Sequence, residues 1–222
     1  MLHIFDIDST VIKKNCAWYF LKEALGAGAV RFSQIRNLPL EWIKYKLGKP
    51  NMDFIEEAVS RFAGIEKSVL ERIAETCFER RIKPVIYAGA SRLITEALSR
   101  GEKVIFATSS IDIIIRPLEC FFGVTGSVAS VLEFSENITT GRLTGDSCFG
   151  QKKQTTVEKW LANNGYSAAS VCFYSDSYID IPLLEFCGRA VAVNPDKILA
   201  KEAKKRGWEI VRFREVLKFT IL

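Results

Sequence analysis

The stretch that decides the fold is Met1-Leu2-His3-Ile4-Phe5-Asp6-Ile7-Asp8-Ser9-Thr10, an apolar run that stops at a carboxylate. Met1 to Phe5 predicts a short buried strand, and the acids and hydroxyls after it predict a polar loop. Asp6 and Asp8 are separated by one residue, so in an extended turn their side chains project from the same side. The loop therefore presents two carboxylates directly beyond the end of a strand.

Strand and helix alternate in the second part of the chain, after Pro84. Short apolar runs predict strands at residues 104–107, 128–132, 171–174, 190–193 and 208–211. Helical spacing predicts helices at residues 91–99, 111–122, 155–163, 181–186 and 198–205. Strands that alternate with helices of this length imply a parallel sheet with helices on both faces, so we expect an α/β, Rossmann-like core.

A helical segment interrupts this pattern after the first strand. From about Asn15 to Arg81 apolar residues recur at helical spacing, as Trp18, Leu21 and Leu25 do. Glycines and a proline punctuate the segment, which predicts about four helices. We therefore expect two domains: an α/β core of residues 1–14 and 82–222, and an inserted all-helical domain of residues 15–81.

Four polar clusters stand where the predicted strands end or the next helix begins. They are Asp6 to Thr10, Thr108-Ser109-Ser110, Lys152-Lys153, and Asp176-Ser177-Tyr178-Ile179-Asp180. In open α/β sheets, ligands bind beyond the carboxyl ends of the strands. We expect the four clusters to meet at that edge.

The residue types in these clusters suit chemistry on a phosphate ester. One carboxylate of a pair can attack while the other moves protons. Hydroxyls and N–H groups at the start of a helix can hold an anion, and a lysine can reach a phosphate. Two acid pairs at one edge repel each other unless a cation joins them, and magnesium prefers hard oxygen ligands. The pattern predicts magnesium-dependent attack of a carboxylate on a phosphate monoester.

Each cluster alone has a plainer interpretation. Asp6 and Asp8 could be solvated loop acids, and residues 108–110 could be a helix cap. The two lysines could be surface residues, and the acids of the last cluster could favour a helix start through its dipole. The placement of all four after strands of one alternating chain favours the site.

Composition narrows the class of protein. Hydrophobic residues make up 48% and charged residues 26% of the 222 residues, which is typical of a globular chain. The net charge of +5 comes without a long basic run, so we expect no nucleic-acid partner. No apolar run reaches the ~18 residues of a spanning helix, so we expect no membrane partner and a cytoplasmic protein. His3 is the one histidine and the cysteines form no Cys-x-x-Cys pair, which disfavours zinc.

At the four clusters the chain resembles the haloacid dehalogenase superfamily, in the branch of phosphoserine phosphatase and its relatives. The resemblance covers nearly the whole chain. Its motifs are similar to Phe5 to Thr10, Ile105 to Ser110, Gly150-Gln151-Lys152-Lys153, and Tyr174 to Asp180. The helical insert is similar to the branch's cap, and Val193-Asn194-Pro195-Asp196 resembles a segment of less characterised phosphatases in the branch.

The resemblance implies roles for these residues. Asp6 would be the nucleophile and Asp8 the general acid and base. Thr108, Ser109 and Lys153 would hold the phosphoryl group, and Lys153 is preferred to Lys152 because it lies three residues after Gly150. The magnesium ligands would be Asp6, the backbone carbonyl of Asp8 and Asp176, with Asp180 in support.

One position departs from the branch's pattern. Phosphoserine phosphatases carry a glutamate, seven residues after the second aspartate, that binds the substrate's amino group; here that residue is Asn15. Phe54 and Arg61 keep a spacing that resembles the substrate-binding phenylalanine and arginine of that cap, although they could equally be a core residue and a solvated one. We therefore expect a relative of the phosphoserine phosphatases that is not strict for phosphoserine.

The leading hypothesis is a phosphatase of a small phosphorylated metabolite. One alternative is a phosphotransferase that passes the same aspartyl phosphate to an acceptor other than water. Another is a phosphate-responsive binding module like a receiver domain, which is shorter and has no helical insert. The sequence names neither the substrate nor the oligomeric state.

Overall fold

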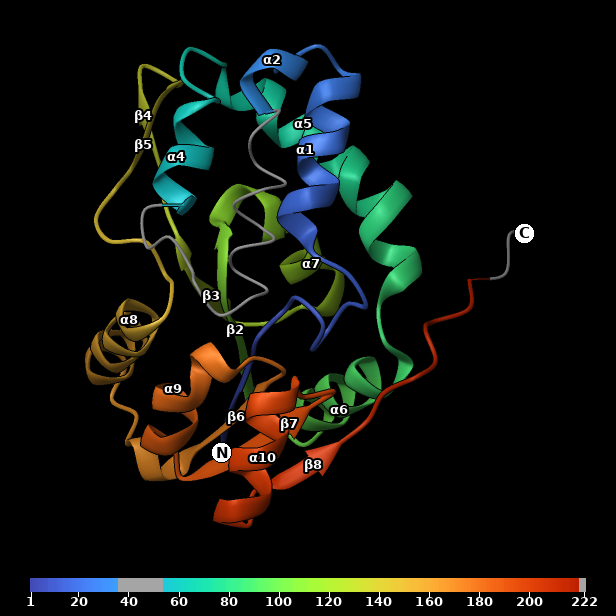
Figure 1. Cartoon of the computed structure of the whole chain (residues 1–222), viewed down its shortest axis with the longest axis vertical. Coiled ribbons are helices and arrows are strands. Elements are labelled where there is room, and N and C mark those ends of the chain that lie inside the picture. The colour runs from blue at the N-terminus through green and yellow to red at the C-terminus, as the bar shows by residue number, and fades with distance from the viewer. Residues whose placement is uncertain (36–53, 220–222) are drawn as a thin grey trace.

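The computed structural model describes residues 1–35 and 54–219. Its core is a sheet of six parallel strands in the order β3-β2-β1-β6-β7-β8 (Figure 1). The strands are β1 (Leu2–Phe5), β2 (Lys103–Ile111), β3 (Gly126–Ser130), β6 (Val171–Ser175), β7 (Arg189–Val193) and β8 (Glu209–Val211). Because β1 pairs with both β2 and β6 in parallel, the residues that follow these three strands leave the sheet at one edge.

Helices cover both faces of the sheet, which confirms the expected α/β fold. Leu2 and Ile4 of β1 pack on one face against α8 (Gln151–Asn163), α9 (Ile181–Phe186) and α10 (Lys197–Arg206). Phe5 packs on the other face against α6 (Ala88–Ser99) and α7 (Asp112–Phe122). Successive side chains of a strand point to opposite faces, so a strand buried on both sides is apolar throughout. Short helical turns lie at η2 (Lys83–Val85), η3 (Ala168–Ser170) and η4 (Tyr178–Asp180).

The segment after β1 is helical in its described part. It holds α1 (Cys16–Gly26), α2 (Phe32–Ile35), α4 (Phe54–Ser60), α5 (Lys67–Cys77) and one π-helical turn, η1 (Phe78–Ile82). Figure 1 shows these helices gathered at the end of the molecule away from α10 and β8. Phe20 of α1 and Leu70 of α5 are fully buried in the same apolar cluster as Phe5, so the insert is packed continuously onto one face of the core.

A β-hairpin that the sequence analysis did not predict joins this helical insert. It consists of β4 (Leu132–Ser135) and β5 (Ile138–Leu143), paired antiparallel. Its turn residues Glu136 and Asn137 have left-handed φ values of 50° and 65°, a backbone typical of two-residue hairpin turns. The expected strand at 128–132 is in fact the end of β3 and the first residue of β4. The feature of the sequence that could have indicated this hairpin is Asn137 in its two-residue turn.

Backbone hydrogen bonds fasten the hairpin to the insert. The N–H of Gly64 donates to the Thr139 carbonyl at 2.8 Å, and the N–H of Thr139 donates to the Ile65 carbonyl at 2.9 Å. The N–H of Lys67 donates to the Asn137 carbonyl at 2.7 Å. Figure 1 shows the hairpin beside α4. The insert is thus held by the hairpin as well as by the chain that enters and leaves it.

We expect Gly141→Ala to destabilise this junction by about 3 kcal/mol, or a fall in Tm of roughly 10 °C. Gly141 has a φ of +75°, and an added Cβ would lie 2.7 Å from the Cβ of Ala63 and 3.1 Å from the Ser60 carbonyl oxygen. Gly145→Ala is the matched control, since its φ is +87° but no atom lies within 4 Å of the added Cβ. Thermal unfolding of both variants isolates the steric contact, and equal losses of Tm would contradict it.

None of the helices in the described ranges is long and apolar enough to cross a membrane.

Candidate active site

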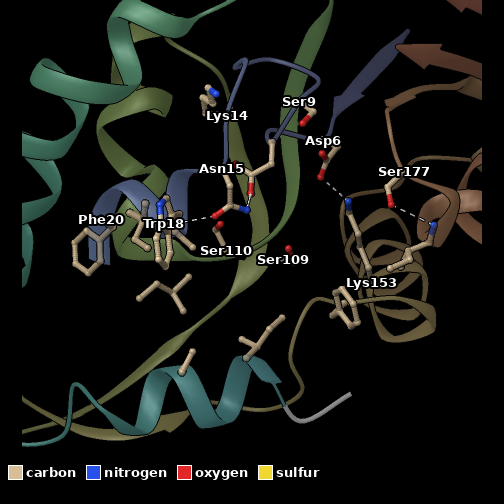
Figure 2. A pocket seen from close by; sticks show the side chains of 18 of the residues that line it. Asp6, Ser9, Lys14, Asn15, Trp18, Phe20, Ser109, Ser110, Lys153 and Ser177 are labelled. Carbon is tan, nitrogen blue, oxygen red and sulfur yellow. Dashed lines mark hydrogen bonds and ion pairs between the residues drawn. The ribbon is translucent and has the colours of Figure 1, made fainter. Parts of the chain in front are cut away.

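A cavity of about 430 Å³ lies between the edge of the sheet and the helical insert. One end is polar and is lined by side chains that follow the strands: Asp6, Asp8, Ser109, Lys153, Asp176 and Asp180. The other end is lined mainly by apolar side chains of α1, α4 and α7. Figure 2 shows Asp6 and Lys153 on one side of this pocket and Trp18 and Phe20 on the other. The polar clusters predicted from the sequence therefore meet around one space.

Lys153 is the centre of the polar end. Its ammonium donates to Asp6 Oδ1 at 2.8 Å and to Asp180 Oδ2 at 2.7 Å, and its side chain is almost completely buried. The hydroxyl of Ser175, the last residue of β6, also donates to Asp180 Oδ2 at 2.7 Å. A buried lysine with carboxylates on two sides holds its charge in one place.

Burial and neighbouring charges set the protonation of these groups. Burial raises the pKa of Asp6 to about 7; the charge of Lys153 opposes this shift, and the charges of Asp180 and Asp8 add to it. Burial lowers the pKa of Lys153, but the charges of Asp180 and Asp6 outweigh burial and raise that pKa above the ordinary lysine value. The lysine is therefore charged. Burial and the charges of neighbouring acids, by contrast, make it harder for Asp6 to lose its proton.

Lys152 lies outside the site, although it is adjacent to Lys153 in sequence. Its exposed side chain pairs with Asp146 at 3.3 Å. Both lysines lie in the first turn of α8, where neighbouring side chains point about 100° apart. The geometry thus brings Lys153, and not Lys152, to the cavity.

Asp8 is oriented by the start of α1. The N–H of Cys16 donates to Asp8 Oδ1 at 2.8 Å, and the Asn15 amide donates to Asp8 Oδ2 at 2.6 Å. Asn15 also caps α1, since its Oδ1 accepts the N–H of Trp18 at 2.8 Å. By the family resemblance, Asn15 stands where phosphoserine phosphatases carry a substrate-binding glutamate. In the structure Asn15 lines the cavity, but its amide is engaged by Asp8 and the helix start.

The hydroxyl cluster belongs to the end of β2 and not to a helix start. β2 runs to Ile111, and its pairing with β3 becomes irregular between Ala107 and Ile111, as at a bulge that redirects side chains. Ser109 and Ser110 line the cavity. Thr108 is buried outside the lining and accepts the N–H of Ser110 at 3.2 Å. Its phosphate-binding role stays a prediction.

Of the two proposed substrate residues, Phe54 and Arg61, only Arg61 has a described side chain. Arg61 is absent from the lining residues, and its guanidinium donates to the carbonyl oxygen of Glu57 one turn earlier. Phe54 begins α4, but its side chain lies outside the described residues. Phe62, just after α4, lines the cavity.

The loop that bears Asp176 and Asp180 is held in place by Asp196. Asp196 Oδ2 accepts the N–H of Tyr178 at 2.7 Å, and its backbone N–H donates to the Asp176 carbonyl at 2.9 Å. Its Oδ1 caps α10 by accepting the N–H groups of Ile198 and Leu199, both at 2.8 Å. The segment Val193 to Asp196 therefore supports the site without lining it.

The oxygen donors at the polar end fit magnesium. In the described ranges no three His, Cys, Asp or Glu side chains are grouped closely enough to hold a metal ion. The expected set needs only two carboxylates, Asp6 and Asp176, with the Asp8 carbonyl and water. Burial, then the charges of Asp6, Asp180 and Asp8, raise the pKa of Asp176 well above its usual value, so a cation here would relieve repulsion.

Comparisons with known proteins place the chain among hydrolases. It is 31% identical to a histidinol-phosphatase of Neisseria meningitidis serogroup C (strain 8013), with 96% of this chain and 99% of that protein covered. It is 29% identical to a phosphoserine phosphatase of Mycobacterium tuberculosis (strain ATCC 25618 / H37Rv), with 95% and 70% covered. The crystal structure of a protein of unknown function from Bordetella pertussis Tohama I matches with a TM-score of 0.84 at 26% identity, covering 95% of this chain and 97% of that one.

A family model described as haloacid dehalogenase-like hydrolase matches residues 4–185. That range contains all four polar clusters and the insert between the first and second of them. The expected family and the expected class of enzyme are confirmed: the chain belongs to the haloacid dehalogenase-like hydrolases.

Proposed function

We propose that this phosphatase is magnesium-dependent and hydrolyses a small phosphate monoester through a phosphorylated Asp6. The observation that carries the proposal is the buried ammonium of Lys153, held between Asp6 and Asp180 at the polar end of a cavity. A fixed positive charge beside a carboxylate suits a phosphoryl group that passes to that carboxylate. The relatives named histidinol-phosphatase and phosphoserine phosphatase support the same class of substrate.

Asp6 and Asp8 divide the chemistry. A carboxylate oxygen of Asp6 attacks phosphorus, the bond from phosphorus to the alcohol oxygen breaks, and Asp8 gives its proton to that oxygen. Burial raises the pKa of Asp8, although the hydrogen bond from the Cys16 N–H lowers it in part. The raised pKa favours the protonated acid that this step needs. Asp8 then takes a proton from water as the water oxygen attacks phosphorus. The bond from phosphorus to the Asp6 oxygen breaks, which releases phosphate and restores the Asp6 carboxylate.

The other residues hold the phosphoryl group and the ion. Lys153 and Ser109, with Thr108, bind the phosphoryl oxygens. Asp6, the Asp8 carbonyl and Asp176 would hold magnesium, and Asp180 supports them by positioning Lys153. When bound, magnesium supplies positive charge that offsets the repulsion between the phosphoryl oxygens and Asp6.

We further propose that residues 15–81 act as a cap domain over a core of residues 1–14 and 82–222. The cavity lies between these two parts, so the cap can exclude water from the phosphorylated intermediate. A cytoplasmic location stays a prediction, as does the absence of nucleic-acid and membrane partners.

Release of inorganic phosphate from a panel of monoesters, with and without magnesium, tests the proposal. We expect turnover with magnesium, and loss of turnover after exhaustive chelation. Calcium is expected to inhibit, because its larger and looser shell does not hold the in-line geometry. Full activity after chelation would contradict the metal assignment, and transfer to an added alcohol in preference to water would favour the phosphotransferase alternative.

Magnesium is expected to raise Tm much more at pH 8 than at pH 5. Because the pKa of Asp6 is raised from its ordinary 3.8 to about 7, the folded metal-free protein binds this proton more tightly than the unfolded chain does. Stability from this group is therefore full below about pH 4 and is lost as the pH rises toward 7. At pH 8 Asp6 is charged, and a cation bound beside it offsets the loss of stability. Thermal scans with magnesium or chelator at both pH values measure this, and equal shifts would contradict it.

A further inference from the structure

The cavity extends well past the phosphate site into an apolar chamber. This chamber is lined by Phe20 and Leu21 of α1, by Ile55, Ala58, Val59 and Phe62 in and just after α4, and by Ile111 and Ile114 at the start of α7. Val59, Phe62 and Ile114 are each buried, with 2%, 6% and 3% of their surface exposed. Figure 2 shows Phe20 across the open space from Asp6 and Lys153. The leaving alcohol of any monoester bound at Asp6 must extend toward these side chains or toward the mouth of the cavity.

The charges of the described lining residues are confined to the phosphate end and the mouth. The acids are Asp6, Asp8, Asp176 and Asp180, all at the polar end. Besides Lys153, the lining cations are Lys13 and Lys14, whose exposed side chains lie in the loop between β1 and α1. No acidic or basic side chain of α1, α4 or α7 lines the cavity in the part of the chain that the structure describes. The described walls of the chamber thus offer a charged group no partner of opposite sign.

A substrate with an amino acid head fits this chamber poorly. Phosphoserine carries an ammonium and a carboxylate close to its ester oxygen, and both would enter the chamber. The Asn15 amide is already engaged by Asp8 and by the N–H of Trp18. The guanidinium of Arg61 does not line the cavity. Burial of a charge without a hydrogen-bonded partner is strongly unfavourable, whereas apolar walls favour methylene groups and aromatic rings.

We propose that the substrate is the phosphate monoester of an apolar alcohol, whose uncharged alkyl or aryl body fills the chamber. This inference rests on the proposed phosphatase function and adds the class of leaving group. Contact between the walls and the alcohol is present in both ground state and transition state, so its effect should appear in kcat/KM.

The first test is a ladder of ethyl, butyl and hexyl phosphate, with phenyl phosphate, phosphoserine and histidinol phosphate, all with magnesium. We expect kcat/KM to rise about fourfold per methylene until the chamber is filled. Hexyl phosphate is then preferred to ethyl phosphate, and to both amino substrates, by at least tenfold. Phenyl phosphate distinguishes an aromatic body from an alkyl chain. A flat ladder, or a tenfold preference for either amino substrate, would overturn the inference.

The second test places a hydroxyl in the wall without changing its shape. Val59→Thr is expected to lower the hexyl-to-ethyl ratio of kcat/KM at least threefold. Val30→Thr is the matched control, because Val30 is equally buried in the same cluster, at 3%, but does not line the cavity. A second pair, for use if Val59→Thr does not fold, is Ile114→Ala with Ile113→Ala as its control. Ile114 lines the cavity and its neighbour Ile113 does not. An unchanged ratio in the folded wall variants, or the same fall in the controls, would contradict the chamber as the binding site.

The proposed function and the proposed class of leaving group can fail separately. If no monoester in the ladder releases phosphate with magnesium, the proposed function itself fails. If phosphate is released but the ladder is flat, only the class of leaving group is wrong.

Discussion

Asp6→Asn is expected to abolish phosphate release, by about 10⁴-fold or more, while the chain stays folded. Asp6 follows β1 at the sheet edge, accepts a hydrogen bond from Lys153 and lines the cavity. Two neighbouring carboxylates are engaged by other groups: Asp180 by Lys153 and Ser175, and Asp8 by Cys16 and Asn15. An amide of the same shape keeps the packing but cannot attack phosphorus.

The fold of this variant is expected to be intact and, without metal at pH 8, at least as stable as wild type. Burial raises the pKa of Asp6, so its carboxylate costs stability at high pH and a neutral amide removes that cost. Asp146→Asn is the control, because Asp146 is an exposed acid that pairs with Lys152 at the surface. We expect the control to keep full activity. Mass spectrometry of rapidly quenched wild type should find the phosphoryl group on the peptide that contains Asp6, and its presence on another peptide would show the nucleophile to be misassigned.

Lys153→Ala and Lys152→Ala are expected to differ by at least 100-fold in kcat/KM. Removal of the Lys153 ammonium leaves Asp6 and Asp180 buried without their shared partner. Loss of one member of a buried ion pair costs about 3–5 kcal/mol, so we also expect a clear fall in Tm. Lys152 pairs with Asp146 at the surface, where both side chains are substantially exposed, and such pairs contribute about 0–1 kcal/mol.

Steady-state kinetics and thermal unfolding of the two variants check this pair of expectations. Because the residues are neighbours on the same turn of α8, any general effect of an alanine on that helix is shared and cancels in the comparison. Magnesium should restore part of the stability of Lys153→Ala, since a second cation can neutralise the same acids. Equal effects on turnover, or a larger effect at Lys152, would reverse the assignment of the phosphate-binding lysine.

The local pattern of the chain was enough to predict its sheet and the edge that carries the site. Short apolar runs in the sequence indicate buried strands, and each predicted core strand overlaps a strand of the structure. Asp6, Ser109 and Asp176 could be found because each lies within a few residues of such a run. The β4–β5 hairpin was missed because its half-exposed strands lack a strong apolar signal, and its main cue was the turn at Glu136 and Asn137.

The sequence by itself determined the α/β core, the position of the helical insert and the residues at the strand ends, since these depend on neighbours only a few residues away. The tertiary structure decided which side chains share a space. In the folded chain Asn15 donates a hydrogen bond to Asp8, and Arg61 does not line the cavity. The apolar chamber forms where α1, α4 and α7 meet. A cavity is defined by the packing of elements far apart in the chain, and helical periodicity marks a buried face without saying whether protein or substrate covers it.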